Sequence, residues 1–173
     1  MRFTGFLLLT LILVSCGAES GRFRIEGRFR NLNQGEFYVY SRDGATDGMD
    51  TIKVADGRFA YETDLERPAT FVIVFPNFSE QAVFGEPGAT ATISGDVSNL
   101  KEMEIEGTDD NELMTDLRMR INKLSPPEIT AAVEEFVREN PASSAAMYAV
   151  ERYIIMKGMP DYGKAYELTA LMI

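Results

Sequence analysis

The sequence contains no histidine and only one cysteine, Cys16. Without histidine the chain lacks the side chain that most often acts as a general base, and it cannot form a Ser-His or Cys-His nucleophile pair. A lone cysteine excludes an internal disulfide, a thiolate metal site and a Cys-x-x-Cys redox pair within this polypeptide. We therefore expect a non-enzymatic protein with no catalytic, cofactor-binding or metal-binding residues.

Positive charge is also scarce, with 17 Lys and Arg against 27 Asp and Glu and a formal net charge of −10. So acidic a chain is a poor partner for nucleic acid. No two carboxylates stand out from the solvated acidic surface that this composition implies, so no acid–base pair is assigned. Hydrophobic residues make up 45% and aromatic residues 10% of the chain, which favours a packed core over disorder.

A short apolar segment opens the chain. After Arg2, large apolar residues fill positions 3–14 except at Thr4, Gly5 and Thr10. This run of about a dozen residues is shorter than the ~20 that cross a bilayer as a helix. Residues 1–15 are therefore predicted to be a signal peptide that is removed.

The segment Leu13-Val14-Ser15-Cys16 matches the bacterial lipobox, in which a large aliphatic residue and a small residue precede the cysteine. We expect cleavage before Cys16 and lipid on its thiol, so that a mature chain of 158 of the 173 residues is anchored to a membrane. Because Arg2 leaves with the leader, the net charge changes from −10 to −11. The alternatives are an ordinary secretory peptide and an N-terminal helix with a chance cysteine.

The residues after the cysteine bear on location. Gly17, rather than aspartate, favours the outer membrane by analogy with known lipoprotein sorting, and the single Glu19 is too weak an acidic cluster to indicate surface display. The predicted location is thus the cell envelope, as an outer-membrane lipoprotein facing the periplasm.

From residue 22 to residue 30 apolar and polar side chains alternate, which predicts a strand with one solvated face. Turn residues at 31–35 lead into the aromatic run 37–40, and the two runs together predict a hairpin. Asp56-Gly57 predicts a second hairpin, between residues 51–54 and 58–61, because both turn residues tolerate positive φ.

The continuous apolar run at residues 70–75 predicts a strand that is buried on both faces. Three further strands are predicted at residues 81–84, 89–94 and 103–106. About eight short strands without an intervening helix predict an antiparallel β-sandwich or barrel.

Beyond Thr108 the apolar residues recur at helical spacing, which predicts about four helices. Thr108 or Asp109 caps the first, which stops at Ser125, and Ser125 with Glu128 forms the start of the second. The third and fourth helices are predicted at residues 143–157 and 161–173. The expected fold is thus α+β: a signal peptide (1–15), a lipidated tether (16–21), a β-sandwich domain (22–107) and a helical segment (108–173).

Three sets of side chains are candidates for binding. The strand arginines suit an anionic partner, but pairing with this protein's own acids is favoured. Exposed aromatics could stack on sugars or peptides, although core packing is favoured. The methionines fit equally a partner surface and a helical core. These sets are Arg22, Arg24, Arg28 and Arg30; Tyr38, Tyr40, Phe71, Phe75 and Phe78; and Met147, Met156, Met159 and Met172.

Several short motifs resemble a known family. They look like the β-rich domain of unknown function DUF4369, which is common in envelope lipoproteins of Bacteroidetes-type bacteria. The motifs are the lipobox, Phe23-x-Ile25-x-Gly27, Asp50-Thr51, Asp56-Gly57-Arg58-Phe59, Gly85-Glu86-Pro87-Gly88 before Ala91-Thr92-Ile93-Ser94-Gly95, and Ile105-Glu106-Gly107-Thr108 with Asn111.

In many members of the family that this chain resembles, the β-rich domain is followed by a helical linker and then by a thioredoxin-like thiol-disulfide oxidoreductase domain. Residues 136–144 look like that linker. The thioredoxin-like part with its Cys-x-x-Cys is absent here, so no redox role is transferred to any residue.

Three functions remain as hypotheses. The first is a non-catalytic envelope lipoprotein, lipidated at Cys16, whose β-domain and helical segment bind an envelope protein partner or act as a spacer. The alternative is the N-terminal part of a truncated or split thiol-disulfide oxidoreductase. A reading frame after Ile173 that encodes Cys-x-x-Cys would support this alternative. The second alternative is a carbohydrate- or peptide-binding lipoprotein that uses Tyr38 and Tyr40.

Overall fold

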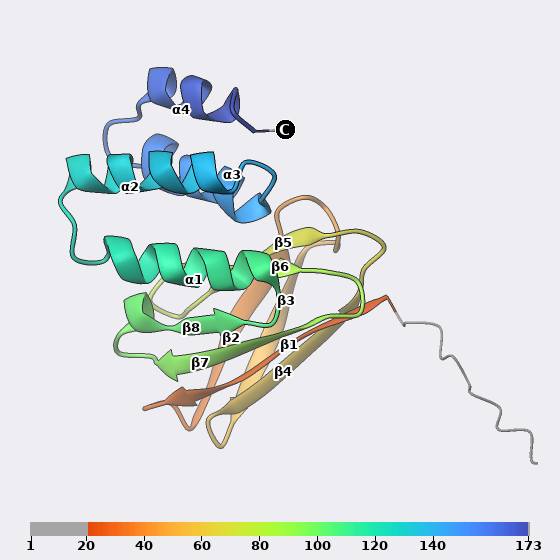
Figure 1. Ribbon diagram of the computed structural model, residues 1–173. Coiled ribbons are helices and arrows are strands. Elements are labelled where there is room, and N and C mark those ends of the chain that lie inside the picture. The colour runs from red at the N-terminus through yellow and green to blue at the C-terminus, as the bar shows by residue number, and fades with distance from the viewer. Residues whose placement is uncertain (1–20, 173) are drawn as a thin grey trace, which may run out of the picture.

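The computed structural model describes residues 21–172 as an eight-stranded sheet followed by a layer of helices (Figure 1). The strands are β1 (Arg22–Arg30), β2 (Gln34–Ser41), β3 (Met49–Ala55), β4 (Arg58–Asp64), β5 (Ala69–Val74), β6 (Glu80–Gly85), β7 (Thr90–Asp96) and β8 (Glu104–Glu106). The helices are the 3₁₀ turn η1 (Leu100–Glu102), α1 (Asp109–Ile121), α2 (Pro126–Glu139), α3 (Ser144–Val150), the π-helical turn η2 (Glu151–Ile155) and α4 (Tyr162–Thr169). The predicted α+β architecture is confirmed.

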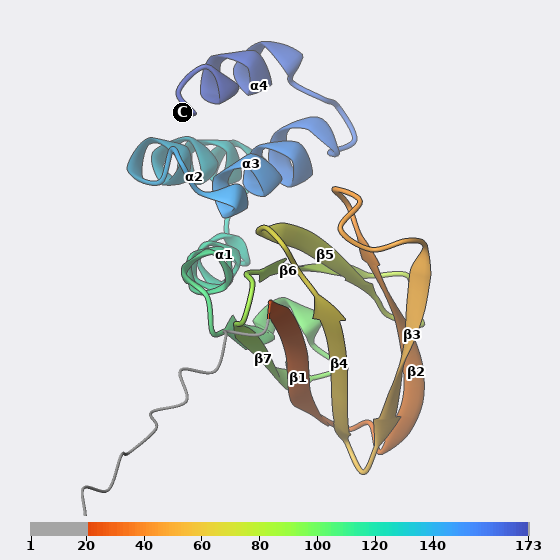
Figure 2. The same ribbon diagram turned by 90° about the vertical axis from the view of Figure 1, so that its right-hand side faces the viewer.

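The strands form one sheet in the order β6-β5-β2-β3-β4-β1-β7-β8, antiparallel except for the parallel pair β1–β7. β3 and β4 pair through Ala55 and Arg58 next to their turn, and beyond it each strand pairs with its other neighbour. The sheet folds over at this point, so that its two halves face each other as a near-barrel (Figure 2).

Phenylalanine rings from the two halves meet in the interior of the near-barrel. The ring centroids of Phe29 in β1 and Phe37 in β2 lie 5.7 Å apart. Phe23 of β1 stacks on Phe71 of β5 with ring centroids 5.4 Å apart. Aromatic pairs at this spacing add to the free energy gained from burying their area. The apolar face of β1 that the alternation predicted is therefore the wall of the core.

The predicted hairpin of the first two strands is wrong. β3 and β4 lie between β1 and β2 in the sheet. The turn of β3 and β4 takes the hydrogen bonds at this end: the Phe29 amide donates to the Gly57 carbonyl (2.7 Å), and the Gly57 amide donates to the Asn33 carbonyl (3.0 Å). Turn residues at 31–35 indicated that the chain reverses, but they do not specify which strand becomes the neighbour.

The second predicted hairpin is confirmed. Asp56 and Gly57 form a two-residue turn with φ values of 52° and 73°, as the type I′ geometry requires. The expected common face of β3 and β4 also forms, because Ile52, Val54 and Phe59 are buried in the near-barrel core and Tyr61 packs against it.

Two neighbouring strands are buried on both faces. In β5, Phe71 and Ile73 point into the near-barrel, while Val72 between them is also buried, as predicted. In β6, Val83 belongs to the near-barrel core, whereas Ala82 and Phe84 belong to a second core that the helices form. β6 is thus a wall that the two cores share.

Sequence signals located the helix starts better than the helix ends. Thr108 caps α1 by accepting from the Asn111 amide, and the capping box of Ser125 and Glu128 starts α2. The predicted ends were too late in two cases: α1 stops at Ile121 rather than at residue 125, and α4 stops at Thr169. Apolar residues beyond both ends misled the prediction, because Leu124, Leu171 and Met172 pack on the helical core without being helical.

The helices stack outward from the sheet. α1 lies against the near-barrel, α2 and α3 cover α1, and α4 is outermost in both views (Figures 1 and 2). No helix among residues 21–172 has the length and apolar composition needed to cross a membrane.

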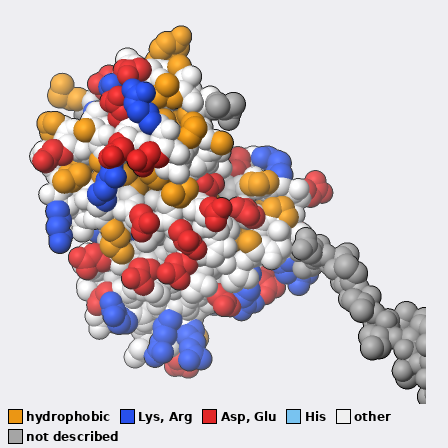
Figure 3. All heavy atoms as spheres, in the orientation of Figure 1, with side chains coloured by type: hydrophobic (Ala, Val, Ile, Leu, Met, Phe, Trp, Pro, Cys, Tyr) orange, Lys and Arg blue, Asp and Glu red, His pale blue; other side chains and the backbone are white. Residues whose placement is uncertain are grey.

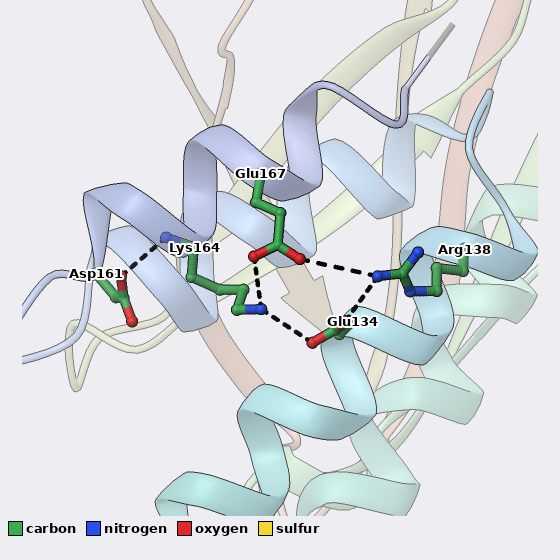
Figure 4. A network of polar contacts seen from close by, with 5 residues as sticks. All are labelled: Glu134, Arg138, Asp161, Lys164 and Glu167. Carbon is green, nitrogen blue, oxygen red and sulfur yellow. Dashed lines mark hydrogen bonds and ion pairs between the residues drawn. The ribbon is translucent and has the colours of Figure 1, made fainter.

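An ion-pair network fixes α4 on α2 (Figure 4). The Lys164 ammonium lies 3.2 Å from the Glu134 carboxylate and 2.8 Å from that of Glu167, and Arg138 contacts the same two carboxylates at 2.8 and 3.8 Å. Hydrogen bonds from Arg138 and Lys164 lower the pKa of Glu134. Asp161 begins α4 by accepting from the Lys164 amide at 2.9 Å.

Gly27 of the Phe-x-Ile-x-Gly motif tests the near-barrel packing. A Cβ at this position would lie 2.0 Å from the Ile93 carbonyl oxygen and 2.9 Å from Cζ of Phe59. Gly27→Ala should lower the free energy of unfolding by about 3 kcal/mol, measured by urea denaturation, because β1 and β7 must separate. Gly158→Ala is the matched control, since nothing lies within 4 Å of its added methyl group. Equal stability of the two variants would refute this close approach.

Candidate functional site

The predicted lipidation site, Cys16, and the signal peptide at residues 1–15 lie outside the described residues. The first element that the structure describes, β1, begins at Arg22. Lipidation at Cys16 therefore stays a prediction.

The strand arginines divide into two groups. Arg24 pairs with Glu26 and Glu62, and Arg22 lies 3.7 Å from Glu62, so these two follow the favoured interpretation of pairing with the protein's own acids. Arg28 and Arg30 line an open surface hollow with Glu102 and Glu104 at the other end of the strand. The four arginines therefore do not gather into one anion site.

The predicted aromatic candidates also divide. Phe71 and Phe75 are buried in the near-barrel core, so core packing is correct for them. Tyr38 and Phe78 are exposed and Tyr40 is partly buried. The five side chains thus do not form one stacking platform.

Of the four candidate methionines, three lie exposed on the surface of the helical layer. Met147, Met156 and Met159 are exposed, and Met172 packs partly against the helical core. Hydrophobic side chains gather over this end of the molecule, above a face rich in carboxylates (Figure 3). On α4 the exposed large hydrophobic side chains are Tyr162 and Tyr166.

Helix α1 lies between the two edges of the sheet, and Asn111 joins it to the first edge, β6. The Asn111 amide group donates to the Phe84 carbonyl oxygen and its Oδ1 accepts from the Phe84 amide, both at 2.8 Å. Asn111 is 1% exposed. Its side chain thus pairs both backbone groups of an edge residue, as a neighbouring strand would.

One turn later, Thr115 makes the equivalent contact with the second edge, β8. Its Oγ1 donates to the Ile105 carbonyl oxygen (2.9 Å) and accepts from the Ile105 amide (3.1 Å). Residues four apart share a helix face, so α1 meets both edges with one stripe of polar side chains.

Arg118 continues this stripe and is 8% exposed. Its guanidinium donates to Gln81 of β6 (3.0 Å), to the Met103 carbonyl oxygen before β8, and to Thr115 (3.3 Å). No carboxylate among residues 21–172 forms an ion pair with it. Burial lowers the pKa of Arg118, yet arginine is protonated across the physiological range, so a buried and unpaired positive charge remains.

Beside Arg118 is a cavity of about 350 Å³, at the junction of the near-barrel and the helical layer. Its charged residues are Lys101, Arg118 and Arg152 against the single acid Glu80. The uncharged polar residues of its wall are Gln81, Asn111, Thr115 and Asn122. The remaining lining is apolar or aromatic: Ala82, Ile105, Met114, Ile121, Leu124, Ile129, Tyr148 and Tyr153. A net positive cavity in so acidic a chain is the feature that distinguishes this location.

The π-helical turn η2 helps to form this cavity. It follows α3 without a break and contributes two consecutive residues, Arg152 and Tyr153, to the lining. π-helical turns inside α-helices often occur at functional sites. Burial raises the pKa of Tyr148 and of Tyr153, so both phenols remain neutral hydrogen-bonding groups at physiological pH.

The polar and charged groups of the cavity can bind a ligand. The described residues hold no cluster of three or more acidic residues placed to bind a metal ion. The lining combines cationic and phenolic N–H and O–H donors with amides, a hydroxyl and apolar side chains, and its excess of positive charge suits recognition of an anion.

Sequence reasoning missed this cavity because it did not single out Arg118. The available signal was the spacing of polar residues at positions 111, 115 and 118, which puts them on one face. Tyr148, Arg152 and Tyr153 carried no comparable signal, because they join the site only through the packing of α3 and η2 on α1.

The fold and cavity define an α+β protein in which a near-barrel sheet carries a helical layer, with a cationic cavity between the two. The chain belongs to the family described as Domain of unknown function (DUF4369), which matches residues 23–114. The match runs from β1 into the second turn of α1 and includes Asn111, whereas Thr115 and Arg118 lie just beyond it. Searches of curated proteins and of solved structures gave no match.

The contacts of Asn111 predict a large loss of stability on its removal. Asn111→Ala leaves the buried Phe84 amide without a partner and the Phe84 carbonyl oxygen with only the Thr108 hydroxyl, and should cost about 3 kcal/mol in urea denaturation. Thr115→Val, which keeps the shape of the side chain, should cost about 1–2 kcal/mol because Ile105 loses the same pairing.

Asn122→Ala is the control, because Asn122 also lies at α1 and no hydrogen bond of its side chain is present among the described residues. It should change stability by less than about 0.5 kcal/mol. An Asn111→Ala variant as stable as this control would show that α1 does not close the sheet edge through Asn111.

Proposed function

We propose that the protein is a non-catalytic lipoprotein of the bacterial cell envelope, anchored by lipid on Cys16. The observation that carries the proposal is the lipobox at residues 13–16, which follows an apolar leader too short to span a bilayer. Outer-membrane attachment with the body facing the periplasm follows from Gly17 by the sorting analogy.

The short tether keeps the folded body close to the membrane. β1 begins six residues after Cys16, and six extended residues reach roughly 20 Å. The helices then stack in successive layers outward from the near-barrel (Figure 1). This arrangement supports a role as a binding or spacing module, in which the helical layer presents a surface to an envelope protein.

The outermost helix has the composition of such a surface. Tyr162, Tyr166 and Met159 are all more than two-thirds exposed at this end of the molecule, with fractions of 69%, 79% and 85%. Tyrosine and methionine are enriched where proteins meet other proteins. The absence of histidine and of a second cysteine from the whole sequence supports a role without catalysis.

Lipidation is tested by Cys16→Ala. The wild-type protein should incorporate labelled palmitate and sediment with membranes, and Cys16→Ala should lose the label, because no other thiol exists in the chain. Ser20→Ala is the neighbouring control and should label like the wild type. Undiminished labelling of Cys16→Ala would defeat the proposal.

Sorting is tested by Gly17→Asp with separation of the two membranes on a density gradient. The wild type should be found with the outer membrane and Gly17→Asp with the inner membrane. If the wild type fractionates with the inner membrane, the location is wrong even though the lipid anchor stands.

A further inference from the structure

The Arg118 guanidinium beside the cavity is not fully used by its contacts with the fold. A guanidinium has five N–H groups. The described residues accept three hydrogen bonds from Arg118, which leaves two N–H groups for an additional acceptor. The three acceptors are neutral: an amide oxygen, a carbonyl oxygen and a hydroxyl. A protein that only needed a bridge between β6, β8 and α1 would gain nothing from leaving a buried charge uncompensated.

The surrounding charges point the same way. Arg152 of η2 and Lys101 of η1 line the same cavity, and neither has an ion-pair partner among the described residues. Surface cations such as Arg28, Arg58 and Lys123 also lack ion pairs, but Arg118 is the only charged side chain among residues 21–172 that is buried. A buried, unpaired cation with two further cations at the same cavity favours an anion supplied from outside.

The rest of the wall indicates which kind of chemical group is attached to the anionic group of the ligand. Met114, Ile121, Leu124 and Ile129 contribute apolar surface, and Tyr148 and Tyr153 add aromatic rings whose hydroxyl groups can accept or donate. The volume of about 350 Å³ falls at the lower end of the range for small-molecule pockets. The space therefore suits one compact ligand with a charged head and an apolar body.

We propose that this cavity binds an organic carboxylate with an apolar or aromatic body, its carboxylate paired with Arg118 and Arg152. Inorganic phosphate fits less well, because it has no apolar body to cover the aliphatic and aromatic side chains that line much of the cavity. Two sources share the proposed chemistry: a free aromatic or aliphatic acid, and the C-terminal carboxylate of a peptide that ends in an apolar residue.

The site belongs to neither part of the chain alone. Gln81, Ile105 and Met114 lie within the DUF4369 match, and Arg118, Arg152 and Tyr153 lie after it. The helical segment thus completes a cavity whose other wall the family domain provides. The inference rests on the proposed binding role, but not on the lipid anchor.

The test uses the chain from Gly17 onward, because residues 21–172 contain both cores and all the contacts that hold them. Isothermal titration calorimetry measures five ligands: 4-phenylbutyrate, N-acetyl-Ala-Phe with a free C-terminus, the uncharged amide of each, and inorganic phosphate. Both carboxylates should bind at millimolar or lower concentration, each at least about tenfold more tightly than its amide. The tighter of the two carboxylates identifies the source of the ligand.

Three variants locate the binding. Arg152→Gln, which removes no described ion pair, should weaken carboxylate binding about tenfold, and Arg118→Met should weaken it further. Arg120→Met is the matched control on the same helix, because Arg120 pairs with Glu135 instead of lining the cavity. Thermal denaturation of each variant reports whether it is folded. Because the comparison of carboxylate with amide uses the wild type, it holds even if Arg118→Met fails to fold.

Equal affinity for a carboxylate and its amide would overturn the proposal, as would phosphate binding as tightly as either carboxylate, or no binding up to about 10 mM. Unchanged binding by a folded Arg152→Gln would overturn the assignment to this cavity. None of these outcomes affects palmitate labelling at Cys16, so a failure here is distinguishable from a failure of the proposed anchoring.

Discussion

The fold depends on how helix α1 satisfies the two edges of an incompletely closed sheet. β6 and β8 end the strand order, so each has one side without a strand partner. Unpaired backbone groups at an edge cost free energy when buried and invite association when exposed. Asn111 and Thr115, one helical turn apart, each pair both backbone groups of one edge residue. A single helix thereby takes the place of the strand pairing that would have closed a barrel.

The same helix explains why a cavity exists at this place. A closing strand would have filled the space between the edges with backbone, whereas a helix brings long side chains and leaves room beside them. Arg118 reaches both edges in the next turn, at Gln81 and at the carbonyl of Met103. The side chain that completes the closure is therefore also the charge that the cavity presents to a ligand.

Local patterns predicted every strand and the start of each α-helix, because alternation, Asp-Gly turns and capping residues act over a few positions. The prediction that no helix interrupts the strands was wrong for the short 3₁₀ turn η1 between β7 and β8. They could not predict partners. The first two strands looked like a hairpin, yet the β3–β4 turn occupies the hydrogen bonds between them. Arg118 was missed for a similar reason. A charged residue in a helix usually faces solvent, and only contacts with strands more than a dozen residues earlier in the chain bury it.

Because β6 is a wall of both cores, the family domain does not pack independently of the helical layer. Val83 supports one core while Ala82 and Phe84 support the other, so neither layer keeps its packing if the other melts. The recognised domain stops at residue 114, in the middle of a helix whose remaining turns complete both the closure and the cavity. The segment that defines the family is therefore shorter than the segment that packs as one stable unit. An excised copy of the family domain would be a near-barrel whose edge at β8 lacks its contacts with α1.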